Sequence, residues 1–219
     1  MKKYILIIAS LLITCLVHAQ EVKINSNRSI ESGGALKIES SATEWQDLKV
    51  NLESSFNSAA VELTSGTSGP HERFIKNNED VESLSFIVQL PFDWKEGTTI
   101  YPKLNWKSET SATGNVVWNF EYTWANLNTI SPPESYPAIT INTIVAKGPL
   151  KAKRSISTNL TNGNIGIDGA GKKISSYIIC RISRNSNNAN DTYNADVCVM
   201  SFSFQIEKNV FESQTLTSK

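Results

Sequence analysis

The chain is poor in the side chains that most often carry catalysis or bind metals. Its 219 residues include only two histidines and three cysteines. His71 is the one histidine beyond the first twenty residues, so any Ser/His/Asp or Cys/His constellation would depend on it. The sequence has no G-x-S-x-G nucleophile motif and no C-x-x-C or H-x-x-x-H spacing of the kind found at zinc sites. We therefore expect no catalytic triad, no metal centre and no cofactor.

An excess of charge is also missing. Lysine and arginine together number 21, as do aspartate and glutamate, so the formal net charge is +0. Loss of residues 1–20 would remove Lys2 and Lys3 and no acid, which leaves 19 basic and 21 acidic side chains and a net charge of −2. A protein that binds nucleic acid normally carries a basic patch or stripe. The charge balance therefore predicts no nucleic-acid partner.

The N-terminus has the pattern of an export signal. Two lysines precede an apolar run from Tyr4 to Val17, and residues 17–19 form a small-residue cleavage site before Gln20. The run is shorter than the roughly 20 residues that a membrane span needs. Residues 1–20 are therefore predicted to be a signal peptide, and the protein to be secreted or displayed at the cell surface. The alternatives are lipidation at Cys15, which ends the word Leu-Ile-Thr-Cys, and a plain N-terminal anchor.

Helical periodicity is absent over any ten consecutive residues, whereas alternation of apolar and polar residues recurs. Strand-like alternation covers residues 84–90, 100–106, 116–124, 174–182 and 198–206, and residues 164–167 read as a short strand between turns. Strands at this spacing predict an all-β antiparallel sandwich, most simply a jelly roll. The expected organisation is a signal peptide at 1–20, a polar arm with short strands at 21–80, the sandwich at 81–208 and a loosely ordered tail at 209–219.

Four of the five tryptophans fall between residues 94 and 124. Several of these aromatic residues alternate with polar ones, so they are expected to share the face that a sandwich buries. The predicted core aromatics are Trp106, Trp118, Phe120, Tyr122 and Trp124. Aromatics next to turns are better placed to contact a ligand such as a glycan. Those candidates are Trp94, Tyr136 and Tyr193.

Two further kinds of chemistry are weaker alternatives. A carboxylate pair can hydrolyse glycosides, and the acids available for one are Asp93 with Glu96, and Glu121. A secreted carbohydrate-active enzyme is therefore the second functional hypothesis. The Asn- and Asp-rich loop at 185–194 contains oxygen ligands of the type that calcium prefers, although such loops more often bind nothing.

The two cysteines that remain after the signal suggest a disulfide. Cys180 and Cys198 lie on consecutive predicted strands, and their mean position, 189, falls in the loop that joins them. If the two strands form a hairpin, the cysteines lie opposite each other within the distance that a disulfide spans. Because an exported protein meets an oxidising compartment, we predict the bond. Two buried free thiols are the alternative.

About two thirds of the chain resembles a domain that is common at the C-terminus of tailed-phage virion proteins. The matching words, in order, are Glu44-Trp45-Gln46-Asp47-Leu48, Gln89-Leu90-Pro91, Asp93-Trp94-Lys95-Glu96-Gly97-Thr98, Tyr101-Pro102, Trp106, Gly114-Asn115-Val116-Val117-Trp118, Glu121-Tyr122-Thr123-Trp124-Ala125-Asn126, Gly169, Gly171-Lys172-Lys173-Ile174-Ser175-Ser176, Cys180-Arg181 and Asp191-Thr192-Tyr193. This chain differs in its export signal, and in Lys103 and Asn105, where the family often has histidines.

The resemblance implies a structural module of the fibre type with no enzymatic activity. Such a module acts by assembly, by attachment to a surface glycan or protein, or by both. The fibre-type resemblance and the polar arm at 21–44 lead us to expect a homo-oligomer, most simply a trimer. The polar arm is too poor in apolar residues to fold alone.

Overall fold

The computed structural model describes fourteen short and long elements of the chain. The described residues are 22–25, 28–30, 36–38, 44–50, 52, 60–62, 71–74, 76, 82–108, 110–127, 137–147 and 154–208. The predicted signal peptide and the predicted C-terminal tail both lie outside these ranges. Among the described residues, no helix has the length and hydrophobicity needed to cross a membrane.

Nearly all regular structure in the described residues is strand. The elements are β1 (Val22–Asn25), β2 (Arg28–Ile30), β3 (Leu36–Ile38), β4 (Glu44–Val50), β5 (Ala60–Glu62), β6 (His71–Phe74), β7 (Ser83–Gln89), β8 (Tyr101–Ser108), β9 (Asn115–Ala125), β10 (Thr140–Lys147), β11 (Ser155–Asn159), the 3-10 helix η1 (Asn162–Asn164), β12 (Tyr177–Arg184) and β13 (Val197–Lys208). The all-β prediction is confirmed.

The strands form two antiparallel sheets with the nested pairing of a jelly roll. One sheet has the order β10-β9-β12-β7, and the other has the order β11-β8-β13-β6-β5, with β4 also paired to β13. From the inside of the sequence outward, β9 pairs with β10, β8 with β11, β7 with β12, and both β4 and β6 with β13. Successive pairs alternate between the sheets, which is how a jelly roll is wound.

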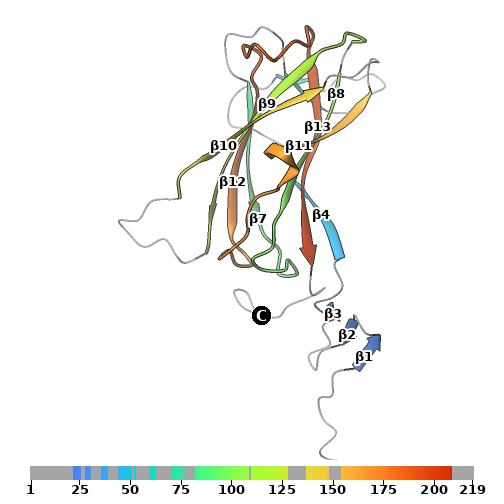
Figure 1. Cartoon of the computed structure of the whole chain (residues 1–219), viewed down its shortest axis with the longest axis vertical. Helices are drawn as coiled ribbons and strands as arrows, with labels where there is room; N and C mark the ends of the chain where they lie inside the picture. The colour runs from blue at the N-terminus through green and yellow to red at the C-terminus, as the bar shows by residue number, and fades with distance from the viewer. Residues whose placement is uncertain are drawn as a thin grey trace, which may run out of the picture.

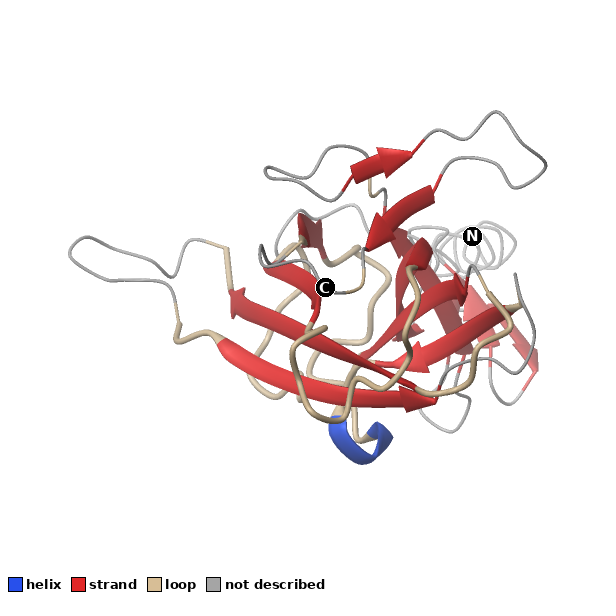
Figure 2. Ribbon diagram, turned by 90° about the horizontal axis from the view of Figure 1, so that it is seen from above, coloured by secondary structure: helices blue, strands red, loops and turns tan. Residues whose placement is uncertain are grey.

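Figure 1 shows these two sheets as the main body of the molecule, with β1, β2 and β3 beyond the end of the sandwich at which β13 finishes. These three strands make a separate three-stranded sheet. Figure 2, viewed along the long axis, shows η1 on one side of the strands. Because β4, β5 and β6 belong to the six-stranded sheet, the predicted start of the sandwich at residue 81 was too late.

The core is built from the aromatic stripe of β9 and the strands that face it. Trp106, Trp118 and Phe120 are fully buried, and Trp124 is 3% exposed. Tyr122 is half-buried and packs against the same cluster. The ring of Trp118 meets Phe74 and Trp106 edge-on at centroid distances of 5.5 and 5.9 Å. The prediction that this face is a core rather than an exposed glycan platform is confirmed.

The predicted disulfide is wrong. Cys180 lies in β12 of the four-stranded sheet, Cys198 lies in β13 of the six-stranded sheet, and both are buried thiols with no disulfide. The two strands are consecutive in the chain, but the jelly roll places them in opposite sheets, so no hairpin joins them. A register shift near Met200 also reverses the alternation of β13. Alternation puts Cys198 on the same face as Met200, which is exposed, whereas Phe202, after the shift, is buried in the core. Cys198 and Phe202 therefore point to opposite faces.

The short strand expected at 164–167 is also absent. Residues 162–164 form η1, and Ile167 makes one isolated bridge to Ile100. Sequence reasoning missed a different strand, β11, which ends five residues before position 164. Its sequence, Ser-Ile-Ser-Thr-Asn, has a single apolar residue and therefore too little alternation to be recognised.

Candidate functional site

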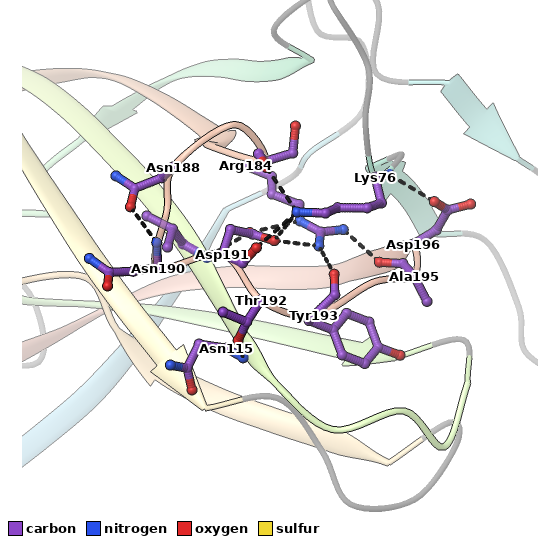
Figure 3. Close-up of polar contacts among 12 residues, drawn as sticks. Lys76, Asn115, Arg184, Asn188, Asn190, Asp191, Thr192, Tyr193, Ala195 and Asp196 are labelled. Atoms are coloured by element: carbon purple, nitrogen blue, oxygen red, sulfur yellow. Dashed lines mark hydrogen bonds and ion pairs between the residues drawn. The ribbon is translucent and has the colours of Figure 1, made fainter.

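The first candidate is a buried charged cluster at one end of the sandwich, which we call the Asp191 end. It comprises residues 110–117 and 184–197 together with Lys76. Figure 3 shows the Lys76 ammonium and the Arg184 guanidinium both directed at the Asp191 carboxylate. Asp191 Oδ1 accepts hydrogen bonds from Lys76 Nζ and Arg184 Nη2, each at 2.9 Å. Asp191 Oδ2 accepts from Arg184 Nε at 3.1 Å and from the Val117 amide at 2.9 Å.

The two cations are held on their other sides as well. Arg184 donates to the carbonyls of Ala195 and Tyr193, each at 2.7 Å. Lys76 Nζ donates to the carbonyls of Ser186 and Asp191. The Asp191 and Arg184 side chains are 0% and 1% exposed, so these charges are buried, and each makes four hydrogen bonds. Burial alone would raise the pKa of Asp191, but the donors from Arg184, Lys76 and Val117 outweigh it and lower that pKa.

This arrangement locks the loop between β12 and β13 onto the start of β9. Tyr193 is fully buried, and its amide donates to the Asn115 carbonyl at 2.9 Å. Gly114 fits beneath the loop so closely that a Cβ there would lie 2.7 Å from the Thr192 carbonyl carbon. Tyr193 therefore belongs to the packing, which corrects its prediction as a ligand residue.

The calcium alternative for this loop finds no support in the contacts. Asp191 is the only acid between residues 185 and 194, and each of its carboxylate oxygens already accepts two hydrogen bonds. Across the described residues, no group of three or more His, Cys, Asp or Glu side chains is placed to hold a metal ion.

The opposite end of the sandwich, which we call the Trp94 end, is closed by aromatic and backbone contacts. It comprises residues 90–100, 124–126 and 168–176. Trp94 is fully buried and lies 5.6 Å from the Trp124 ring. Trp124 Nε1 donates to Ser176 Oγ at 2.8 Å, while Lys172 Nζ donates to the Trp124 carbonyl and lies over its ring. A Cβ at Gly169 would lie 2.1 Å from the Thr98 carbonyl oxygen. Trp94 is thus also a packing residue, not an exposed ligand contact as predicted.

Sequence segments that carry the phage resemblance contact one another at these two ends. The segment at 114–118 lies against the segment at 191–193 at the Asp191 end. The segments at 93–98, 121–126 and 171–176 contact one another at the Trp94 end. Each of these segments supplies hydrogen bonds or packing to another. These motifs therefore specify how loops are fixed to the sandwich, and they identify no open site.

The carboxylates proposed for glycoside hydrolysis are all held in ion pairs. Asp93 Oδ2 lies 2.5 Å from Lys208 Nζ. Glu96 accepts from the Ile174 amide at 2.8 Å and pairs with Lys173, and Glu121 pairs with Arg181 on the next strand at 2.5 Å. Each acid therefore has a local structural partner.

Exposed apolar side chains gather instead on the outer face and edge of the four-stranded sheet. Eight large apolar residues are exposed in the described part of the chain, and five belong to this sheet or to the residue just before β10. Alternation places them outward, because the even-numbered residues of β7, β10 and β12 face the core. These five residues are Ile87, Ile139, Ile141, Val145 and Tyr177, with exposures of 65, 64, 61, 49 and 36%. We call this set the sheet face.

A groove of about 440 Å³ lies beside that surface, between the edge strands β10 and β11 and the turn of η1. Ile144, Val145, Ala146 and Ile156 contribute its apolar lining. The polar lining consists of Lys147, Ser157, Thr158, Asn159, Thr161, Asn162 and Asn164. Hydroxyl and amide groups of this kind exchange hydrogen bonds with sugars and peptides alike, and no aromatic side chain lines the groove.

Two remaining sequence candidates are only partly described. Tyr136 lies outside the described residues. His71 begins β6 at the backbone level, where it pairs with Glu62 of β5. Sequence reasoning missed Ile141 and Val145, although a signal was present. Apolar residues occupy both faces of β10, as Ile141 and Val145 outward and Ile144 and Ala146 inward, whereas a half-buried strand normally alternates.

No model of a known protein family matches the chain, and no curated protein matches it. The functional argument therefore rests on the residues and surfaces described above.

Proposed function

We propose that the protein is a secreted, non-enzymatic structural module of the phage-fibre type, which acts by self-association and by attachment to a surface glycan. The observation that carries this proposal is the distribution of contacts. Both ends of the sandwich are closed by polar or aromatic contacts, while apolar side chains of the sheet face stay open to solvent. Three of them, Ile139, Ile141 and Val145, follow one another along β10 and the residue before it, and a row of exposed apolar side chains is typical of an interface with another protein.

Self-association is tested by the mass of the exported protein in solution. Sedimentation velocity across roughly 1–100 µM, a range that brackets interfaces of ordinary size, should show a species larger than one exported chain, which is itself lighter than the 24.2 kDa of all 219 residues. N-terminal sequencing of the same sample should find the chain beginning at or next to Gln20, as the export signal predicts. A single-chain mass throughout the range would refute the assembly half of the proposal.

Glycan attachment is assigned to the β11 and η1 side of the groove, because the hydroxyl and amide groups of its lining all come from residues 157–164. The test is a glycan array probed with the wild type and with Asn162→Ala. Asn162 is exposed and lies in η1, away from the core. Binding that is lost in Asn162→Ala supports the groove. Absence of binding to every glycan, or binding that the variant retains, counts against it.

A further inference from the structure

Among the described strands, β10 is an edge with few of the features by which proteins normally protect one, and η1 approaches only its second half, residues 144–147, across the groove. Among the described strands it pairs only with β9, and that register runs without interruption from Thr140 to Lys147. It is eight residues long and contains no proline, no bulge and one charge, Lys147 at its end. Edges are usually kept from pairing by short length, charges, proline or bulges.

Other edges of the described sandwich differ from β10. β4 carries three charged side chains along its seven residues and exposes one large apolar residue, Trp45. β11 is five residues long with one apolar side chain. β7, the opposite edge of the same sheet, also lacks charge, proline and bulge, but it exposes a single large apolar residue, Ile87. β10 differs from all three because its outward side chains include two exposed apolar residues. Its unpaired backbone and its exposed apolar side chains therefore occur on the same strand.

The pattern of β10 is symmetric about Thr143. Ile141 and Val145 lie two residues on either side of it, and all three point outward and are exposed. When two copies of an antiparallel edge pair across a two-fold axis, facing residues must share a face, so their numbers must differ by an even count. An axis at Thr143 meets this condition. It sets Ile141 of each copy opposite Val145 of the other.

The charges are compatible with the same register. An axis at Thr143 places Lys147 opposite Ile139 of the second copy, so the two lysines lie at opposite ends of the contact. Eight residues at about 3.4 Å each separate them, roughly 27 Å. No like charges therefore meet across the junction, and each Ile139 gains the aliphatic stem of a lysine.

We propose that β10 pairs with β10 of a second copy about a two-fold axis at Thr143. The two four-stranded sheets then form one continuous sheet of eight strands, with both core faces on the same side. The occupant of the edge is a second copy of this chain because the exposed pattern is self-complementary. The inference deepens the self-association proposed above and rests on it. It specifies a dimer contact, whereas the fibre-type resemblance alone led to a trimer.

The sharpest test is a cysteine at the axis. Thr143→Cys faces its own counterpart, and opposite residues in antiparallel strands are within the range that a disulfide spans. The variant should form a covalent dimer without reductant. Lys147→Cys is the control, because it lies on the same strand and face but its counterpart is about 27 Å away. It should remain a single chain on a non-reducing gel.

A second variant tests the energetics of the contact. Ile141→Lys inserts a charge into the apolar pair and should raise the dimer dissociation constant at least tenfold. Ile165→Lys is the matched control: the same substitution at a side chain that is 73% exposed and lies off the strand should leave the mass unchanged. Thermal melts of both variants report whether the fold is retained.

The outcomes separate this inference from the proposed function. The β10 contact is supported if Thr143→Cys forms a covalent dimer while Lys147→Cys does not, and if Ile141→Lys has the mass of a single chain. A larger wild-type species that neither cross-links at residue 143 nor responds to Ile141→Lys overturns the β10 contact and leaves self-association standing. A wild type that stays a single chain, with no covalent dimer of Thr143→Cys, overturns both.

Discussion

The two ends of the sandwich are fixed by different physics. At the Asp191 end, a carboxylate and two cations are buried together, and all four side-chain hydrogen bonds that Asp191 accepts are charge-assisted. At the Trp94 end, a tryptophan pair fills the space, the Trp124–Ser176 hydrogen bond is buried, and Asp93 pairs with Lys208. Both arrangements tie loops to the sheets. They should differ in how much stability the protein loses when one member is removed.

The largest effect is expected from Asp191→Ala. The change leaves Arg184 and Lys76 as buried cations without their carboxylate, and breaking a buried pair in this way costs about 3–5 kcal/mol. The free energy of unfolding from a urea or guanidinium titration measures it. Asp168→Ala, at an exposed acid in the Trp94 end, is the control and should change stability by less than about 0.5 kcal/mol. Equal effects of the two changes would mean that the charged cluster does not fix its loop.

Gly114→Ala should come next. The backbone at Gly114 has a φ of +142°, which L side chains rarely adopt, and the added Cβ would lie 2.7 Å from the loop backbone. Strained backbone of this kind costs about 1–3 kcal/mol, and the contact adds to it. Gly171→Ala isolates the strain, because Gly171 has a φ of +72° with nothing within 4 Å of an added Cβ. The Gly114 variant should be the less stable of the two in the same denaturant titration. The reverse order would mean that the loop at 192–193 moves away easily.

At the Trp94 end, Ser176→Ala removes the acceptor of the buried Trp124 N–H. A buried donor left without its acceptor costs about 1–3 kcal/mol. The loss should be smaller than that of Asp191→Ala because no charge is stranded. Ser157→Ala, at an exposed serine of β11, serves as the control. A loss as large as that of Asp191→Ala would remove the distinction between the two ends.

Acid should weaken the Asp191 end. The pKa of Asp191 is lower in the folded chain than in the unfolded chain, so the unfolded state takes up the proton first as pH falls. Stability from this group is complete above about pH 4, the range of an ordinary aspartate, and is lost as pH falls further. Unfolding titrations between pH 2 and pH 7 should show a shallower acid loss for Asp191→Ala than for Ser176→Ala. Parallel curves would mean that other acids dominate.

The state of the two thiols should affect stability least, and alkylation reads that state directly. Alkylation of the unfolded wild type without reductant should add two adducts to the chain that lacks residues 1–20, because Cys180 and Cys198 are not linked. In the folded protein, burial raises the pKa of the Cys180 thiol, so its labelling should be slow. An unfolded chain that takes up no adduct until it is reduced would restore the disulfide.

The sequence determined the fold class and most of the core. Alternation over residues 84–90 and 116–124, and again over 202–206, was enough to predict the sandwich, because one buried face per strand imposes that pattern. It also predicted that Trp118 and Phe120 would be buried. The candidate site was harder to predict from the sequence. Trp94 and Tyr193 lie next to turns in the sequence, but they are covered by loops that only the fold brings to them.

Tertiary structure alone decided which strands became neighbours. Cys180 and Cys198 lie on strands that are consecutive in the sequence, and the predicted disulfide assumed that these strands form a hairpin. The jelly roll instead places them in opposite sheets. The register shift at Met200 then reversed the parity of β13. Likewise, only the sheet order shows that β10 is an edge. Alternation reports which face of a strand is buried, whereas pairing depends on long-range contacts that no local pattern encodes.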